Sequence, residues 1–268
     1  MLDLNLVIVA KDRALQLDSL LRSIRDHYSV FPLSVTILYT TSSETYELGY
    51  NMLKNRAILP NIRWIQETSF ATDLRLVVED LPEKSLVQFM TDDDIVFRPF
   101  DCSSIDGFKT SDLFFSLRVD CSYGRFKNPI FKQVKPTLRW NWYPFFKNRS
   151  ANFWYYPFSV DGNIFHTEDI RKMLSLISFK APNSFEGAMH GARKKWCFMK
   201  KRTAIATTQS VLFNNPMNSV QNEGETWNTA ISPEWLNQQY LEGKEIDNSV
   251  LYAAEPNEVH FAVELKLV

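Results

Sequence analysis

The stretch 86–94 reads LVQFMTDDD, a largely apolar run that leads directly into three aspartates. Short apolar runs bounded by polar residues are typical of buried strands. Three adjacent carboxylates repel one another, so folding them together requires a cation or several hydrogen-bond donors. Mg²⁺ and Mn²⁺ both prefer carboxylate oxygens. The stretch therefore predicts a buried strand that delivers Asp92, Asp93 and Asp94 to a metal site.

In an extended segment, residues two apart face the same way. Asp92 and Asp94 are therefore expected to share one ligand, with Asp93 turned toward the fold. The alternative is that the triplet is only a solvated acidic turn.

The residues before this stretch alternate between strand and helix patterns. Strands are expected at 4–10, 34–40, 61–66 and 86–90, and helices at 14–27, 44–57 and 72–79. This order predicts an α/β fold with a mainly parallel, mixed sheet flanked by helices. Ligands of such sheets bind beyond the carboxyl ends of the strands. Lys11-Asp12-Arg13, Thr41-Ser42 and the aspartates should meet at that edge.

The second part of the chain has a different texture, because residues 113–165 are crowded with aromatic side chains. Helices are expected at 167–176, capped by Thr167, and at 233–242, and an edge strand is expected at 258–266. Neither a repeat nor a low-complexity linker divides the chain. The sequence predicts a single domain.

Composition excludes several classes of protein. The 268 residues carry a net charge of −1, so nucleic acid is not an expected partner. Three separated cysteines without a CxxC motif argue against a zinc site and favour a reducing compartment. The apolar run 6–10 is too short for a signal peptide or a membrane span. A cytoplasmic protein is expected, and it could also rest on the inner face of the membrane.

The first hundred residues resemble the GT-A glycosyltransferases. The resemblance lies in the strand LVIVA followed by KDR, the strand SVTILYT, and LVQFMTDDD with its DxD motif. It implies that 1–100 bind a nucleotide-sugar and that 101–268 form an aromatic-rich acceptor half of the same domain. It also implies an Mn²⁺ or Mg²⁺ cofactor ligated by Asp94, with Asp92 at the ribose or bridging to the nucleotide. It also places Lys11 and Arg13 near the nucleotide and Asp73 near the base or supporting its loop. Thr41 and Asp93, at the same edge of the sheet, are the other donor-side candidates. The alternative is a solvated loop for Lys11 and Arg13, and a surface helix position for Asp73.

Transfer to an acceptor hydroxyl needs a base, for which a carboxylate in a dry pocket is suited. Glu186, in a helix start that Asn183 or Ser184 would cap, is the favoured candidate, and Asp161 is the second. Glu186 could also be a capping glutamate, and Asp161 a turn residue before glycine. The glutamate-aspartate pair common in family 2 glycosyltransferases is absent, so the base and the stereochemistry stay open.

A late histidine is a metal ligand in some GT-A enzymes. His190, four residues after Glu186, and His260 are the two candidates, with a structural role as the alternative for each. Asn214, Asn215 and Asn218, in the polar loop FNNPMNSVQN from 213 to 222, could close over the donor, although an ordinary turn-rich loop is the favoured reading.

A stretch from Arg125 to Arg149 contains basic residues and aromatics but no acidic residue. It fits an anionic glycan or a polyprenyl-linked acceptor, or contact with a membrane surface. A buried aromatic core with a basic rim is the alternative reading. A second basic run, 193–202, could meet phosphate or simply be solvated.

The sequence is therefore interpreted as a metal-dependent glycosyltransferase, with a role in surface polysaccharide synthesis implied by the resemblance. A sugar nucleotidyltransferase is disfavoured, because no glycine follows the first strand. A carbohydrate-binding protein with a structural calcium is the non-enzymatic alternative, although such modules are usually all-β.

Overall fold

The structure is a computed structural model, and it describes residues 3–30, 34–123, 128–134, 136–142, 153–195, 198, 200–218 and 231–268. Its strands, in chain order, are β1 (Leu4–Lys11), β2 (Ser34–Thr40), β3 (Ile62–Gln66), β4 (Leu86–Thr91), β5 (Asp94–Val96), β6 (Asp112–Ser116), β7 (Lys132–Val134), β8 (Thr137–Asn141), β9 (Ile164–His166), β10 (Thr203–Thr207) and β11 (Leu212–Asn214). Its helices are α1 (Ala14–His27), α2 (Glu44–Arg56), α3 (Phe70–Asp80), η1 (Cys102–Gly107), η3 (Phe153–Tyr155), α4 (Thr167–Leu174), α5 (Pro182–Ala192), α7 (Pro233–Leu241) and α8 (Asn248–Tyr252).

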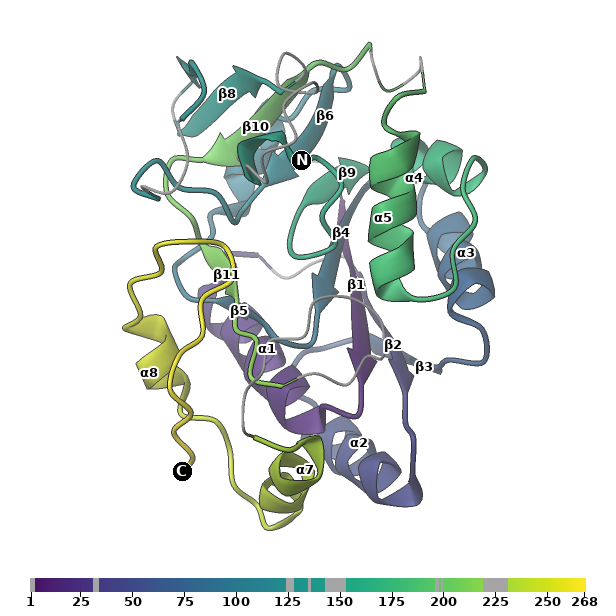
Figure 1. Cartoon of the computed structure of the whole chain (residues 1–268), viewed down its shortest axis with the longest axis vertical. Coiled ribbons are helices and arrows are strands. Elements are labelled where there is room, and N and C mark those ends of the chain that lie inside the picture. Colours follow the sequence, from purple (N-terminus) through teal and green to yellow (C-terminus); the bar gives the residue numbers. More distant parts are fainter. Residues whose placement is uncertain are drawn as a thin grey trace.

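The described strands form one nine-stranded sheet, in the order β3-β2-β1-β4-β9-β6-β10-β8-β7, and a small β11-β5 pair. The four strands β3, β2, β1 and β4 pair in parallel. Strands β9 and β8 run against the other seven. The prediction of an α/β fold with a mainly parallel, mixed sheet flanked by helices is confirmed (Figure 1).

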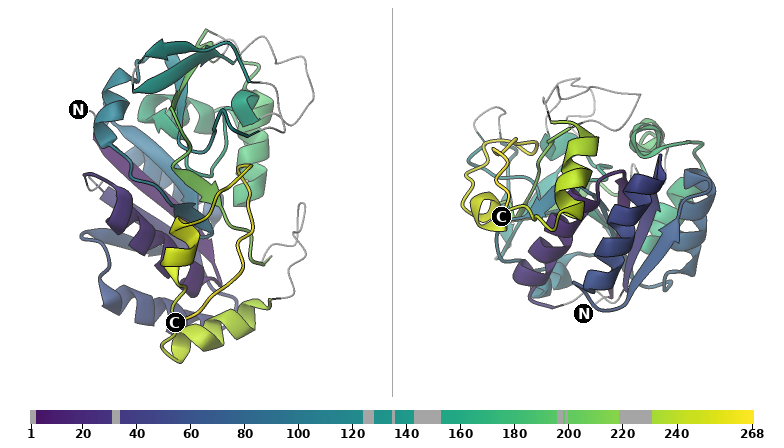
Figure 2. Two further views of the ribbon diagram at one scale, coloured as in Figure 1. Left: turned by 90° about the vertical axis from the view of Figure 1, so that its left-hand side faces the viewer. Right: turned by 90° about the horizontal axis from the view of Figure 1, so that it is seen from below.

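The sheet is buried on both faces, because alternate residues of one strand enter different cores. Leu6 and Ile8 of β1 pack in the core that contains α1, whereas Val7 packs in the core that contains α3 and α5. Figure 1 shows α3, α4 and α5 along one side, while α1, α2 and α7 cover the other. The views in Figure 2 show the same separation into layers. Because both faces of the sheet are buried, its central strands carry largely apolar runs, such as LVQFM at 86–90.

The first half of the chain forms the predicted elements with small shifts of their ends. Leu17, Leu20 and Ile24 of α1 are buried, as their helical spacing indicates. Helix α3 begins two residues before the predicted Thr72.

The predicted N-cap of helix α4 is wrong by one residue. The N-cap is His166, and Thr167 is the first helical residue rather than the cap. The Thr167 hydroxyl lies 2.9 Å from that of Ser85, the residue before β4. The side chain therefore ties the helix to the sheet instead of capping the helix.

Helix α5 also begins earlier than expected, at Pro182, with Ala181 as the N-cap. The Ser184 hydroxyl accepts the backbone N–H of Ala181 at 2.9 Å, so it serves the helix start from inside the helix. Proline fits the first helical position because its missing N–H is not needed there. As a consequence, Glu186 lies in the second turn of α5 rather than the first.

The prediction of an edge strand at 258–266 is wrong. The described tail makes only isolated bridges, His260 with Asn214 and Leu267 with Ile246. Asn214 donates its N–H to Val259 and accepts the N–H of Phe261, each at 2.9 Å. These two bonds lay the tail across the end of β11 and bring His260 to the aspartates.

The described tryptophans of the aromatic stretch belong to the core. Trp140, Trp142 and Trp154 are at most 3% exposed. The Trp140 and Trp154 rings meet edge to face, 5.0 Å between centroids. Most of the basic residues and several aromatics of 125–149 lie outside the described residues. For the tryptophans, the alternative of a buried aromatic core holds.

Within the ranges that the structure describes, no helix is long and apolar enough to cross a membrane.

Candidate active site

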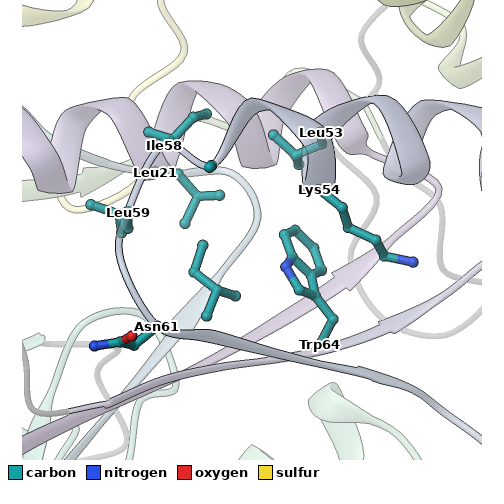
Figure 3. A pocket seen from close by; sticks show the side chains of 9 residues that line it. Leu21, Leu53, Lys54, Ile58, Leu59, Asn61 and Trp64 are labelled. Carbon is teal, nitrogen blue, oxygen red and sulfur yellow. The ribbon is translucent and has the colours of Figure 1, made fainter.

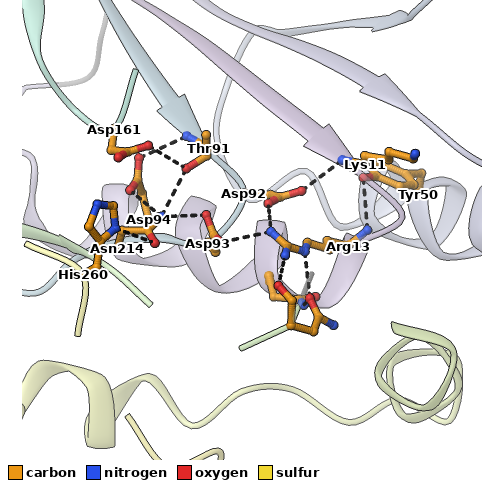
Figure 4. Close-up of polar contacts among 12 residues, drawn as sticks. Lys11, Arg13, Tyr50, Thr91, Asp92, Asp93, Asp94, Asp161, Asn214 and His260 are labelled. Carbon is orange, nitrogen blue, oxygen red and sulfur yellow. Dashed lines mark hydrogen bonds and ion pairs between the residues drawn. The ribbon is translucent and has the colours of Figure 1, made fainter. Parts of the chain in front are cut away.

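The aspartate triplet forms a tight turn between two strands, not an extended segment. Thr91 ends β4, Asp92 and Asp93 form the turn, and Asp94 begins β5. The Asp94 carboxylate closes the turn by accepting the N–H of Thr91 at 3.0 Å. The expectation that Asp92 and Asp94 face the same way therefore fails, because the turn separates them (Figure 4).

Arg13 holds the first two aspartates. Its Nη1 lies 2.9 Å from both the Asp92 and the Asp93 carboxylates. Its Nε donates to the Asn218 side chain at 2.8 Å, and its Nη2 donates to the Asn218 carbonyl. The second Asp92 oxygen accepts the N–H of Lys11 at 3.0 Å. Arg13 is thus directed at the triplet, and part of the repulsion between carboxylates is offset by protein donors.

Asn214, at the end of β11, serves the other side of the turn. Its Nδ2 lies 2.7 Å from the Asp93 carboxylate and 3.2 Å from that of Asp94. Its side-chain oxygen accepts a hydrogen bond from His260 Nδ1 at 3.2 Å. His260 Nε2 in turn accepts from Arg118 Nη2 at 3.2 Å. Of the two candidate histidines, the structure brings His260 to the triplet.

Asp161 reaches the same cluster from the loop before β9. Its carboxylate accepts Arg118 Nη1 at 2.9 Å and the Thr91 hydroxyl at 3.4 Å. The next residue, Gly162, has a φ of +80°, and a Cβ placed there would lie 2.8 Å from Leu212. Only glycine fits both the left-handed backbone and this close approach. The Asp-Gly turn therefore fixes Asp161 against the triplet.

Glu186 lies on α5 beside the same loop. One carboxylate oxygen accepts the N–H of Val160 at 3.0 Å, and the Tyr156 hydroxyl forms a hydrogen bond with the carboxylate. The two candidate bases, predicted from separate segments, are near enough to interact electrostatically through their carboxylates. His190 stacks on Tyr156, 4.6 Å between ring centroids, and among the described residues no contact joins it to the triplet.

Burial and neighbouring charges separate the protonation behaviour of these carboxyls. Burial raises the pKa of Asp92 to about 6, although Arg13 opposes the rise. Burial, Asp161 and Asp93 raise the pKa of Asp94 well above its ordinary value. Burial would raise the pKa of Asp161 too, but the Arg118 guanidinium holds it below its ordinary value.

The pKa values of Glu186 and of the two candidate histidines are shifted as well. Burial and the nearby Asp161 raise the pKa of Glu186 to about 7. Burial lowers the pKa of His190 to about 4, and burial together with Arg118 lowers that of His260. Both histidines are neutral near pH 7, whereas Glu186 changes charge there.

The carboxyl edge of the sheet brings the three polar segments together. Asp12, at a φ of +55°, accepts the N–H of Ser42 at 2.7 Å and so joins the ends of β1 and β2. The Thr41 hydroxyl donates to Glu47 of α2 at 3.2 Å. Asp73 accepts the N–H groups of Thr68 and Ser69, at 2.8 and 2.9 Å, and so supports the loop before α3.

Sequence reasoning missed Arg118. Its side chain is 4% exposed and joins Asp161, Ser159 and His260. A signal was present, because an arginine inside the apolar run LFFSLRV predicts a buried, paired cation. Asn214 was only part of a candidate loop, and nothing local marked it as the residue that meets Asp93 and Asp94.

One described residue from each of the two basic stretches forms an ion pair inside the protein. Arg139 contacts Asp112 at 3.1 Å, and Lys201 contacts Asp169 at 2.5 Å. For Arg139 and Lys201, a structural role is therefore a simpler explanation than contact with an acceptor or a phosphate.

A separate hollow of about 230 Å³ lies between α1, α2 and β3 (Figure 3). It is lined by Leu21, Leu53, Lys54, Ala57, Ile58, Leu59, Asn61, Ile62 and Trp64. None of the candidate site residues lines it, and it is smaller than typical ligand pockets of roughly 300–1,000 Å³. It plays no part in the site.

The described part of the chain contains no group of three or more His, Cys, Asp or Glu side chains arranged to hold a metal ion by themselves. A cation bound here would need further oxygen ligands, which phosphate or water supplies in many magnesium sites.

Comparison with known proteins gives only distant likenesses. No family model and no curated protein matches the chain. Among solved structures, S. aureus TarS 1-349 in complex with UDP-GlcNAc has a TM-score of 0.45 at 12% identity, covering 87% of this chain and 63% of that one. Glucosyl-3-phosphoglycerate synthase from Mycobacterium tuberculosis has a TM-score of 0.48 at 10% identity, covering 83% and 73%. The chain thus spans less than two thirds of the TarS fragment.

Proposed function

We propose that the protein is a metal-dependent glycosyltransferase of GT-A type, which moves a sugar from a nucleotide-sugar donor to a hydroxyl of a glycan or lipid-linked acceptor. The observation that carries the proposal is the state of Asp94. Its side chain is fully buried beside two further carboxylates, Asp93 and Asp161, and no ion pair to it is found among the described residues. Burying a carboxylate without a counter-charge is costly.

A divalent cation fits this surplus of negative charge. Within the described residues, Asp92, Asp93, Asp94 and Asp161 form ion pairs with Arg13 and Arg118 only, which leaves two negative charges in this cluster when all four carboxylates are ionised. Asp94 is the ligand we propose for Mn²⁺ or Mg²⁺. When bound, the metal would neutralise the leaving diphosphate.

Asp92 and His190 are less suited to the metal than their sequence positions indicated. Both oxygens of Asp92 already accept protein hydrogen bonds, from Lys11 and Arg13. We therefore propose that Asp92 orients the turn and the nucleotide, while His260, through Asn214, supports the metal side. This assignment does not require movement of α5, which carries His190.

The protein's own groups favour Glu186 over Asp161 as the base. Asp161 is held ionised by Arg118, so its carboxylate is a weak proton acceptor. The pKa of Glu186, raised to about 7, is close to the working pH expected of an efficient general base. Glu186 would take the proton of the acceptor hydroxyl as the bond to the sugar forms.

The donor would lie along the carboxyl edge of β1, β2 and β4, where Lys11, Thr41 and the triplet meet. We propose that residues 1–100 bind the nucleotide and residues 101–268 the acceptor. Asp73 acts through the loop that it supports. A cytoplasmic position at the inner face of a membrane follows only if the acceptor is lipid-linked.

Titration calorimetry with UDP, GDP and CMP, with and without Mn²⁺, tests the proposal. Metal-dependent binding of one nucleotide is expected for the wild type and for Asp106→Asn, which changes an exposed aspartate outside the site. Asp94→Asn should lose that binding. If the folded wild type binds none of the three nucleotides, the proposal is wrong.

The alternatives are less well supported. A sugar nucleotidyltransferase needs a glycine-rich phosphate loop, whereas Lys11-Asp12-Arg13 follows β1 here. A carbohydrate-binding module with structural calcium is usually all-β, unlike this helix-flanked sheet. Binding of Ca²⁺ and a free glycan without any nucleotide would favour that module.

A further inference from the structure

Glu186 is held by a short chain of contacts that runs along α5. The Tyr156 hydroxyl forms a hydrogen bond with the Glu186 carboxylate. The Tyr156 ring stacks on His190 with an interplanar angle of 23°. His190 follows Glu186 by one helical turn, so both side chains lie on one face of α5. One residue from the loop before β9 therefore bridges two residues of the helix.

The chemistry of these groups fixes the direction of the hydrogen bond. Burial and the Glu186 carboxylate raise the pKa of Tyr156, so its hydroxyl keeps its proton and donates. A donated O–H favours the charged form of a carboxylate and restricts its orientation. His190 is neutral, since burial lowers its pKa to about 4, and it contributes ring contact rather than charge.

We propose that Tyr156 is a positioning residue for the base, holding the Glu186 carboxylate in one orientation, and that His190 clamps the Tyr156 ring. This inference rests on the proposed role of Glu186 in sugar transfer. It assigns no contact between Tyr156 and the substrate.

Other charged groups also act on Glu186 and must stay constant in a test. Asp161, from the loop before β9, raises its pKa, and Arg118, which follows β6, lowers it. Arg193, the C-cap residue of α5, acts on Tyr156 and His190. Tyr156→Phe removes one hydroxyl and leaves all three of these groups and the ring in place.

The first measurement is the pH dependence of kcat for Tyr156→Phe. Without the donated hydrogen bond, the midpoint of the rising limb should move upward by about one pH unit. At pH 6, kcat should fall about tenfold and recover above pH 9, with the KM for the donor unchanged. An equal loss of kcat at every pH, with an unmoved midpoint, would overturn the proposal.

A pair of variants at His190 tests the clamp. His190→Phe keeps an aromatic ring against Tyr156 and should leave the midpoint at the wild-type value. His190→Ala should move it in the same direction as Tyr156→Phe, by a smaller amount. Identical profiles for the alanine variant and the wild type would contradict the clamp.

A readout without turnover separates this inference from the proposed function. The Glu186 carboxyl can be titrated by ¹³C nuclear magnetic resonance, with its signal assigned through its loss in Glu186→Gln. An upward shift in Tyr156→Phe supports the contact even if no transfer is found, in which case the proposed function fails. An unchanged carboxyl titration overturns the inference whether or not the protein is a transferase.

Discussion

Replacing Glu186 by glutamine should stabilise the fold at neutral pH while it removes the proposed base. The carboxyl is held where its charged form is disfavoured, since burial and Asp161 raise its pKa from 4.5 to about 7. At 1.36 kcal/mol per pH unit, this difference corresponds to about 3 kcal/mol. Because the side chain is half-buried, solvent screening reduces the expected effect to roughly 1–3 kcal/mol.

The pH dependence gives the sign. Between pH 4.5 and 7 the folded protein binds the Glu186 proton and the unfolded chain has lost it. The free energy of unfolding of the wild type therefore falls as pH rises through this window, relative to the variant. Below pH 4.5 both states are protonated, so the two proteins should differ least there.

The measurement is urea unfolding of wild type and Glu186→Gln at pH 4.5 and pH 8, with metal removed by chelator. The variant should gain roughly 1–3 kcal/mol on the wild type between the two values. Glu264→Gln, at an exposed glutamate of the tail, should show no such gain. A difference between variant and wild type that is the same at both pH values would refute the reasoning. Activity of the variant should fall by about 10²–10⁴.

Two further substitutions, Gly162→Ala and Arg13→Met, test the frame of the site, and Gly187→Ala is the control for the first. Gly162→Ala should destabilise the protein by about 2–4 kcal/mol, from the left-handed backbone and the clash with Leu212. Gly187→Ala, in a helix with nothing near its Cβ, should instead stabilise by about 0.5–1 kcal/mol, and thermal unfolding that ranks the two the other way would contradict this. Arg13→Met should cost about 3–5 kcal/mol at pH 8, because it leaves Asp92 buried without its cation. The loss should be smaller at pH 5, where protonation of Asp92 relieves the charge, and a loss that does not change with pH in urea unfolding would speak against it.

Several features of the site were accessible from local sequence. The triplet is recognisable because three carboxylates after an apolar run are unusual and need an explanation. Asp161 could be named because it stands in a polar turn before glycine, and Glu186 because it follows a recognisable helix start, although it lies in the second turn of α5. Their meeting could not be foreseen, because it depends on the loop before β9 packing against α5.

The geometry of the triplet is where local reasoning failed. A strand extrapolated through Asp94 puts residues two apart on one face, whereas the chain turns after Thr91 to begin β5. The turn is stabilised by Asn214, 120 residues away from Asp94, and by Arg13, which in turn contacts Asn218 across 205 residues. No periodicity records contacts at that separation.

The sequence by itself determined the alternation of strands and helices, the parallel half of the sheet, and the edge at which polar residues gather. These follow from hydrophobic periodicity and from the common direction of parallel strands, both of which are properties of short segments. Tertiary structure alone decided that Arg118 holds Asp161, that His260 rather than His190 reaches the triplet, and that the described tryptophans form core. Those outcomes depend on which buried polar groups find partners once the sheet order β4-β9-β6-β10 is set, and that order is a property of the whole chain.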